Sequence, residues 1–289
     1  MRLYLIDGTY ELFRSYFGAP KRRTTDGREA GAVHGIVAST LRLLAEDGVT
    51  HVAAAFDSVI ESFRNEIYPF YKTGAGTPED LMEQFPLAER AMRACGVTVW
   101  PMYEYETDDA LATAALRWVD DVEQVVVMSP DKDMAQLYGH PGIVGYNVRT
   151  RRFMDAEGVE AKFGVPPESI PDYLALVGDA ADGFPGLKGW GAKSASTVLA
   201  KYKHIDNIPL EASLWNVPVR GAETLVASLR ANVGDALLFR YLAKLRRDVP
   251  LPDSLSDLQW KGAPRDTFEA LCDELSFGTL RDRPSRWVG

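Results

Sequence analysis

Leu3-Tyr4-Leu5-Ile6-Asp7 shows the pattern that decides the fold, a short apolar run that ends at an aspartate. Residues 51–57 repeat the pattern, and two further aspartates closely follow the β-branched run at residues 125–128. Helix-like segments separate these runs, at residues 10–17, 32–45, 81–95 and 110–119. Short apolar runs that alternate with helices are typical of a parallel, doubly wound sheet. We therefore predict an α/β fold with a central parallel sheet flanked by helices.

The chain changes character after residue 170. Strand-like runs become scarce, and the segments 173–177, 192–202, 222–230 and 236–244 have helical periodicity. A chain of 289 residues is long enough for a main domain with a satellite. We predict an α/β core at residues 1–170 and a helical lobe at residues 171–289.

The composition excludes several classes of protein. Hydrophobic residues make up 46% and charged residues 25%, which are globular values. No apolar run approaches the roughly 20 residues that span a bilayer, and the first seven residues do not form a signal peptide. Cys95 and Cys272 are the only cysteines, too few for a disulfide framework or a cysteine zinc site, and we expect both to be buried. We therefore predict a cytoplasmic protein with no membrane contact.

The net charge of −9 argues at first against a nucleic-acid binder, because phosphate affinity normally comes from an excess of Lys and Arg. The chain has 41 acidic and 32 basic residues. If nine acids belong to one metal site, 32 acids remain against 32 basic residues. The local distribution of charge then decides more than the total.

Seven carboxylates follow the predicted strands, where the carboxyl ends of parallel strands meet at one edge of a sheet, and two more lie in the predicted helical lobe. The nine candidate ligands are Asp7, Asp57, Glu106, Asp108, Asp109, Asp131, Asp133, Asp179 and Asp182. Oxygen ligands without neighbouring Cys or His suit Mg²⁺ or Mn²⁺, and two such ions about 4 Å apart can drive phosphodiester hydrolysis. Helix capping is the better explanation for any single acid. The nine acids form five groups along the chain: Asp7, Asp57, Glu106/Asp108/Asp109, Asp131/Asp133 and Asp179/Asp182. For all five groups together, capping alone is the weaker explanation.

A glycine- and lysine-rich hairpin at residues 183–195 lies between two predicted helices, directly after Asp179 and Asp182. Its candidate contacts are Gly186, Lys188, Gly189, Gly191, Lys193 and Ser194. Glycine amides, a helix amino terminus and two lysines can hold a phosphate backbone without reading bases. An ordinary glycine-rich turn with solvated lysines is the alternative. The two acids upstream favour the binding role.

Aromatic and basic residues alternate at residues 62–74, just after Asp57. An aromatic ring here can stack on an unpaired base, and Arg64 or Lys72 can contact the scissile phosphate. Aromatic residues near a helix more often belong to the core. The position beside the acids favours the functional interpretation.

With these residues in view, the chain resembles the bacterial and phage family of 5′→3′ exonucleases and flap endonucleases, which includes the amino-terminal nuclease domain of bacterial DNA polymerases of the first type. The resemblance runs nearly end to end. It rests on Leu5-Ile6-Asp7-Gly8, Phe56-Asp57, Ser62-Phe63-Arg64, Tyr71-Lys72, Tyr105-Glu106-Thr107-Asp108-Asp109, Asp131-Lys132-Asp133 and Gly178-Asp179-Ala180-Ala181-Asp182. Leu275-Ser276-Phe277-Gly278 matches the closing motif of that domain, which implies that no polymerase follows.

The family implies a PIN-like, resolvase-like core with an arch near residues 58–80 and a helix-three-turn-helix at about residues 171–205, often with K⁺. It implies a first metal at Asp7, Asp57, Glu106, Asp108, Asp109 and Asp131, and a second at Asp133, Asp179 and Asp182. Lys72 and Arg64 would stabilise the transition state, with Asp108 and Asp131 as further catalytic residues. Tyr71 would stack on the terminal base.

The sequence departs from the family at two positions. Ala75 stands where many relatives place a basic residue, and the link to residues 77–80 is shortened, so the arch is expected to hold a 5′ end more weakly. Gly183 stands where Asn is usual, which we expect to loosen the turn that positions Asp182.

The resemblance implies a monomeric 5′ nuclease, associated with the bacterial nucleoid, that acts in replication or repair. Its substrates would be DNA with a 5′ flap, nick, gap or free 5′ end, and its metals two Mg²⁺ or Mn²⁺. An RNA-directed nuclease of the same fold class and a non-catalytic DNA-structure binder remain alternatives.

Overall fold

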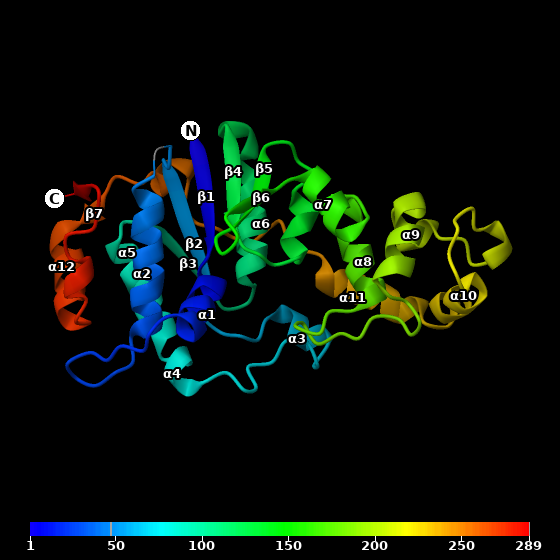
Figure 1. The fold of residues 1–289 in the computed structure, drawn as a ribbon, viewed down its shortest axis with the longest axis horizontal. Coiled ribbons are helices and arrows are strands. Elements are labelled where there is room, and N and C mark those ends of the chain that lie inside the picture. Colours follow the sequence, from blue (N-terminus) through cyan, green and yellow to red (C-terminus); the bar gives the residue numbers. More distant parts are fainter. Residues whose placement is uncertain (47, 289) are drawn as a thin grey trace. The chain divides into compact units, whose positions relative to one another are not determined.

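The computed structural model describes residues 1–46 and 48–288. These residues form two compact units, each built from separate stretches of the chain (Figure 1). Unit 1 comprises Met1–Ser62, Gly74–Ser129 and Arg247–Gly289, and unit 2 comprises Phe63–Thr73 and Pro130–Arg246. The segment at residues 63–73 therefore belongs with the helices of unit 2, whereas the carboxyl-terminal stretch returns to unit 1.

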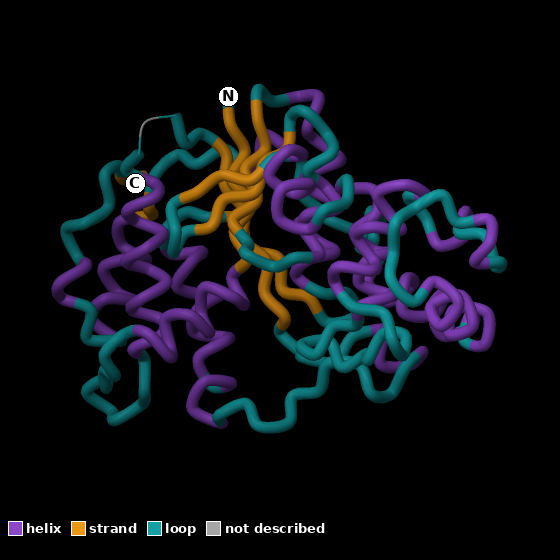
Figure 2. The backbone as a smooth tube through the Cα atoms, turned by 45° about the vertical axis from the view of Figure 1, so that its right-hand side comes forward, coloured by secondary structure: helices purple, strands orange, loops and turns teal. Residues whose placement is uncertain are grey.

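A parallel sheet forms the centre of unit 1. Its strands are β1 (Arg2–Asp7), β2 (His51–Asp57), β3 (Thr98–Met102) and β4 (Gln124–Met128). They lie in the order β3-β2-β1-β4, and Leu5 of β1 is opposite Ala53 and Val127. Every residue of β2 is buried, which is expected for a strand covered on both faces. The pairs β1-β2, β1-β4 and β2-β3 are all parallel, which confirms the predicted central parallel sheet. Its strands are orange in Figure 2.

Helices surround the sheet of unit 1, in agreement with the predicted alternation. They are α1 (Gly8–Gly18), α2 (Gly31–Leu44), α4 (Glu79–Met82), α5 (Gln84–Ala94), α6 (Thr107–Trp118) and α12 (Arg265–Glu274). Helix α2 buries Val33, Ile36, Val37 and Leu41, an apolar stripe at helical spacing. A short parallel pair, β7 (Ala263–Pro264) and β8 (Trp287–Val288), lies near the carboxyl terminus.

Unit 2 is mainly helical. It contains α3 (Phe63–Ile67), α7 (Ala156–Phe163), α8 (Ile170–Val177), α9 (Ala192–Tyr202), α10 (Ala222–Ala231) and α11 (Val233–Ala243). Helix α8 packs against both α9 and α11. Unit 2 also holds an antiparallel pair that the sequence analysis missed, β5 (Ile143–Asn147) and β6 (Arg152–Met154). These strands are short and mix exposed with buried residues, so they lack the continuous apolar run that marks β1 and β2.

Cys95 and Cys272 are both buried free thiols, as expected. In the part of the chain that the structure describes, no helix is long and apolar enough to cross a membrane.

His34 of α2 is expected to make unit 1 sensitive to acid. Its Nε2 lies 3.2 Å from Thr279 Oγ1, and burial, with Arg22 and Arg283 nearby, lowers its pKa from 6.5 to about 4. The unfolded chain therefore binds a proton between pH 6.5 and about 4 that the folded chain does not, and stability falls as pH decreases through this window. His34→Gln should flatten that decrease in urea unfolding at pH 7 and pH 4.5. An unchanged pH dependence would contradict this assignment.

Candidate metal centre and nucleic-acid interface

The acids of unit 1 lie at one edge of its sheet. Asp7 is the last residue of β1, and Asp57 is the last residue of β2. Glu106 follows β3 and stands at the amino terminus of α6, with Asp108 and Asp109 in the first turn of that helix. Because β1, β2 and β3 are parallel, their carboxyl ends bring these acids to the same edge.

Hydrogen bonds from the surrounding backbone and hydroxyls orient the first two carboxylates. Asp7 Oδ1 accepts from the amide of Tyr10 at 2.8 Å, and Asp7 Oδ2 accepts from the hydroxyl of Ser129 at 2.8 Å. Asp57 Oδ1 accepts from the amide of Thr107 at 2.7 Å. Asp7 thus caps α1, and Asp57 holds the start of α6. Each carboxylate oxygen has further lone pairs, so these roles leave room for a cation.

Glu106 and Asp109 also cap a helix. Glu106 and Asp109 form a reciprocal cap on α6, in which the Glu106 amide donates to Asp109 Oδ2 at 3.2 Å. The hydroxyl of Ser62 donates to Glu106 Oε1 at 2.7 Å. Capping therefore describes several of these acids correctly, and it also fixes their orientation before any ion binds.

Unit 2 contains a close cluster of carboxylates. Asp133, Asp179 and Asp182 each offer one oxygen, and these oxygens all lie within 4.8 Å of one another. Asp133 and Asp179 are buried, and Asp182 is half-buried. Asp131 lies two residues before Asp133 and accepts a hydrogen bond from the Asp133 amide at 2.8 Å. The structure thus brings together the three residues that the family resemblance assigns to one metal.

The environment of Asp133 fits a divalent cation. Among the described residues, its buried Oδ1 has no hydrogen-bond partner. Burial raises the pKa of Asp133 well above its usual value, and the neighbouring Asp131, Asp182 and Asp179 raise it further. A buried carboxylate oxygen that faces other carboxylates is costly unless a cation neutralises it. A set made only of carboxylate oxygens suits Mg²⁺ or Mn²⁺.

Lys132 is a residue of this cluster that the sequence analysis did not single out. Its Nζ lies 2.7 Å from Asp179 Oδ2. Burial opposes its charge, but the hydrogen bond to Asp179 and the charges of Asp133 and Asp131 leave the pKa of Lys132 above its usual value. The sequence shows the motif Asp131-Lys132-Asp133. It does not show that Lys132 contacts Asp179, because the two residues are 47 positions apart.

The turn that carries Asp179 and Asp182 is closed by backbone hydrogen bonds. The amides of Asp179 and Phe184 each donate to the other's carbonyl, at 2.8 and 3.1 Å. The Lys72 amide donates to the Asp182 carbonyl at 3.0 Å, which ties the turn to residues 63–73. Phe239 of α11 then stacks on Phe184, with ring centroids 5.5 Å apart.

Gly183 is required by this close approach. Its φ is +82°, and a Cβ at this position would lie 2.3 Å from the Phe70 carbonyl oxygen. The backbone of residues 70–72 therefore occupies the space that a side chain needs. We expected Gly183 to loosen this turn. The structure shows an opposing effect, because the missing side chain lets residues 70–72 approach and lets the Lys72 amide hydrogen-bond to the Asp182 carbonyl.

Gly183→Ala is expected to lower the free energy of unfolding by about 1–3 kcal/mol, from the clash and the left-handed backbone together. Gly189→Ala is the matched control, because Gly189 has φ +87° with no described atom within 4 Å of a Cβ. The control should cost only about 1 kcal/mol. Denaturant unfolding of both variants measures the difference, and equal losses would contradict the clash.

The glycine-lysine hairpin joins α8 to α9. Lys188, Gly189, Gly191 and Lys193 are exposed. Ser194 closes the start of α9, because its hydroxyl accepts from the Gly191 amide at 3.0 Å. The predicted contacts Lys188, Gly189, Gly191 and Lys193 are thus accessible to a partner.

Gly186 and Trp190 anchor the hairpin. Gly186 has φ +70°, and a Cβ there would lie 2.4 Å from the Gly178 amide nitrogen. The indole of Trp190 is buried and donates to the Leu225 carbonyl at 3.3 Å. Gly186 is half-buried and is therefore a packing residue between the hairpin and α8.

The structure places Arg64 and Tyr71 inside unit 2. Arg64 is 1% exposed, and its Nε and Nη2 donate to the carbonyls of Leu242 and Lys244, at 2.8 and 3.2 Å. These carbonyls are at the carboxyl end of α11, so the guanidinium caps that helix. Tyr71 is 2% exposed, whereas Phe70 is 74% exposed. The exposed ring of this segment is therefore Phe70, which the sequence analysis did not select.

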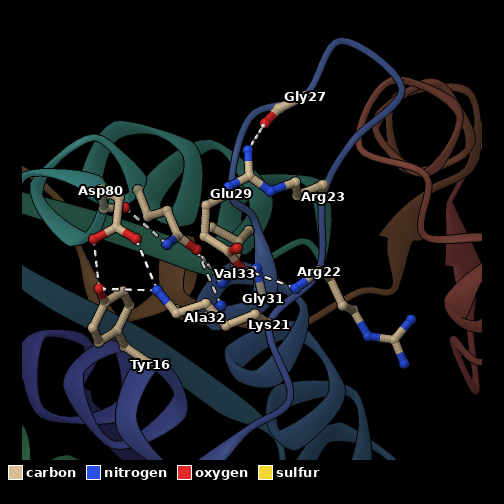
Figure 3. Close-up of polar contacts among 11 residues, drawn as sticks. Tyr16, Lys21, Arg22, Arg23, Gly27, Glu29, Gly31, Ala32, Val33 and Asp80 are labelled. Carbon is tan, nitrogen blue, oxygen red and sulfur yellow. Dashed lines mark hydrogen bonds and ion pairs between the residues drawn. The ribbon is translucent and has the colours of Figure 1, made fainter.

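The end of the predicted arch segment is anchored within unit 1 (Figure 3). The Tyr16 hydroxyl donates to Asp80 Oδ1, and Lys21 Nζ donates to Asp80 Oδ2 at 2.9 Å. Glu29 accepts from the amides of Arg22 and Gly31, which fixes the loop before α2. Asp80 thus fastens α4 to α1 and to the start of that loop.

Two family models together match most of the chain. The model described as "5'-3' exonuclease, N-terminal resolvase-like domain" matches residues 2–164. The model described as "5'-3' exonuclease, C-terminal SAM fold" matches residues 165–266.

The chain is also similar to curated proteins. It is 33% identical to DNA polymerase I of Bacillus caldotenax, over 98% of this chain and 32% of that protein. It is 32% identical to the thermostable DNA polymerase I of Thermus thermophilus, over 96% of this chain and 32% of that protein. The chain therefore spans about a third of the length of these relatives.

Solved structures share the fold. A T5 5′-exonuclease with bound zinc has a TM-score of 0.69 at 20% identity, covering 84% of this chain and 89% of that one. The flap endonuclease-1 of Methanococcus jannaschii has a TM-score of 0.58 at 18% identity, covering 97% and 90%. The predicted α/β fold with a helical lobe is confirmed. With both family models matching in chain order, this chain belongs to the 5′–3′ exonuclease family of nucleases.

Proposed function

We propose that this chain is a divalent-metal-dependent 5′ nuclease that hydrolyses phosphodiester bonds of DNA. Its substrates are DNA with a 5′ flap, nick, gap or free 5′ end, as in replication or repair. The observation that carries this proposal is the cluster of Asp133, Asp179 and Asp182, with a buried carboxylate oxygen that no described residue satisfies. The family supports the same activity.

Two groups of carboxylates would hold two Mg²⁺ or Mn²⁺ ions. The first group is Asp7, Asp57, Glu106, Asp108, Asp109 and Asp131, and the second is Asp133, Asp179 and Asp182. Two such ions, when bound, activate water and stabilise the leaving oxygen. The protein's own contribution is orientation. Capping hydrogen bonds orient carboxylates of unit 1, and the turn closed by backbone hydrogen bonds positions Asp182.

The segment at residues 63–73 supplies the substrate contacts beside the metals. The backbone amide of Lys72 hydrogen-bonds to the Asp182 carbonyl, which holds Lys72 beside the acids of unit 2. We propose that the ammonium of Lys72 stabilises the charge of the scissile phosphate. Arg64 acts here as a positioning residue, because its guanidinium is buried against the end of α11. Stacking on the terminal base falls to Phe70 in this arrangement, and the ring of Tyr68 packs edge-on against Phe70 with centroids 5.7 Å apart.

The glycine-lysine hairpin would bind the phosphate backbone of duplex DNA, with K⁺ as a further ligand of the helix-three-turn-helix. Changing both Lys188 and Lys193 to Gln should weaken DNA binding at every sequence. It should also reduce the slope of log K against log salt by about 2. Lys203→Gln is the matched control, since Lys203 already pairs with Glu168 at 3.0 Å. Titrations at several salt concentrations measure the slope, and an unchanged slope in the double variant would exclude this surface.

A substrate comparison tests the proposed function. A 5′-labelled flap made of DNA should be cleaved in the presence of Mg²⁺ or Mn²⁺, and the same flap made of RNA should be cleaved more slowly. Faster cleavage of RNA would favour an RNA-directed nuclease. Binding of the DNA without cleavage under either metal would favour a DNA-structure binder.

The cellular setting follows from the same proposal. A nuclease of this family with bacterial relatives would act as a monomer in the cytoplasm, at the nucleoid. Light scattering of the purified chain with and without duplex DNA tests the monomeric state.

A further inference from the structure

Lys132 occupies an unusual place among the carboxylates of unit 2. Its Nζ is 2.7 Å from Asp179 Oδ2, within the cluster that fits a divalent ion. Asp179 is 3% exposed, whereas Lys132 is 35% exposed. The ammonium therefore reaches a buried carboxylate from a side chain that still borders solvent.

The charges of this cluster favour a counter-cation in the metal-free protein. Asp133, Asp179 and Asp182 offer oxygens within 4.8 Å of one another, and like charges at such distances repel strongly in a partly buried site. One ammonium offsets part of this repulsion. It does so at Asp179, an acid that a divalent ion would also need.

We propose that Lys132 is a resident counter-ion of this cluster, which pairs with Asp179 in the metal-free protein and has to release it when a divalent ion binds. The proposal rests on the second metal site of the proposed function. Lys132 then competes with the metal for Asp179. The metal affinity of the site depends on how much more strongly the divalent ion than the ammonium binds this carboxylate.

The chemistry of lysine suits such an exchange. Its ammonium is a compact, strongly hydrated charge on a flexible stem, so it can return to water without moving the backbone. An Arg would hold the carboxylate through a planar fork and leave less readily. The exposure of Lys132 gives the stem room to turn outwards.

Competition of this kind predicts a gain of metal affinity when the ammonium is removed. A partly exposed ion pair contributes modestly, so Lys132→Met should bind Mn²⁺ about three- to tenfold more tightly. The same variant should melt at a lower temperature in EDTA, because the acids lose their counter-ion. A lysine that merely organised the site would weaken Mn²⁺ binding when removed.

Mn²⁺ titration of the full chain, by calorimetry and by electron paramagnetic resonance, tests the proposal. Lys132→Gln is a second neutral variant that has to behave like Lys132→Met, and Lys132→Arg keeps the charge and should not gain affinity. Asp179→Asn identifies the site by abolishing this Mn²⁺ binding event.

The outcomes separate the two proposals. Asp179-dependent Mn²⁺ binding that stays equal or weakens in both neutral variants overturns the counter-ion role and leaves the nuclease proposal intact. An equal gain in Lys132→Arg overturns it as well, because size and not charge would be responsible. If no Mn²⁺ binding depends on Asp179, the second metal site is wrong and the role of Lys132 fails with it.

Discussion

Asp133→Asn is expected to stabilise the metal-free chain and to lower its cleavage of a 5′ flap by about a hundredfold or more. The two effects have one cause. Burial and three neighbouring aspartates make the ionised Asp133 unfavourable, as its raised pKa shows, and Asn removes that charge. The same change removes a ligand that a divalent ion would need. Thermal unfolding in EDTA and single-turnover cleavage in Mn²⁺ measure the two effects.

Asp155→Asn is the matched control for this prediction. Asp155 accepts a hydrogen bond from the Gly158 amide at 2.9 Å and caps α7, a role that Asn performs equally well. Neither its melting temperature nor its cleavage rate should change measurably. If Asp133→Asn instead destabilises the metal-free chain, or cleaves at the wild-type rate, the cluster does not have the character assigned to it.

Arg64→Met is expected to lower the free energy of unfolding by about 3–5 kcal/mol. The buried guanidinium donates to the carbonyls of Leu242 and Lys244, so its loss leaves acceptors at the end of α11 unsatisfied. The positive charge is also lost at a helix carboxyl terminus, where it is favourable. Denaturant unfolding followed by circular dichroism measures the change.

Arg220→Met is the control, because Arg220 is exposed, and its replacement should stay within about 0.5 kcal/mol of wild type. The prediction also separates two roles for Arg64. A residue that only contacts the scissile phosphate would lose cleavage and keep its stability. That result would restore the transition-state role implied by the family and contradict the positioning role.

The sequence predicted the sheet of unit 1 well because β1, β2 and β4 are buried on both faces. Such strands are continuous apolar runs, and β1 and β2 each end at the aspartate that marks the edge of the sheet. The hairpin β5-β6 was missed because its residues are partly exposed and carry no such run. Asp7 and Asp57 were recognisable because each ends one of these apolar runs, at the edge where the carboxyl ends of parallel strands meet.

The side-chain directions around the site could not be predicted. Arg64 and Lys72 have the same basic character in the sequence, yet Arg64 is buried against residues about 180 positions away, at the end of α11. The residues near Arg64 in the chain do not predict that contact. Lys132 shows the converse, because its sequence neighbours are obvious and its partner Asp179 is distant. Long-range pairing of this kind needs the tertiary structure.

Helix capping, the alternative explanation of the acids, is correct for some of them. Asp7 and Asp109 do cap helices. Capping and cation binding use different lone pairs of the same carboxylate. One residue can therefore orient a helix and serve a metal, so evidence for the first role does not count against the second.

The product ladder from a single 5′-labelled DNA flap tests the central claim most directly. The chain is first stripped with EDTA, and Mn²⁺ is then added back to wild type and to Asp133→Asn. We predict no cleavage before the addition. After it, wild type should release labelled mononucleotides or an intact flap, and Asp133→Asn should release almost none. Cleavage in EDTA, or no wild-type cleavage in either Mn²⁺ or Mg²⁺, would contradict the account.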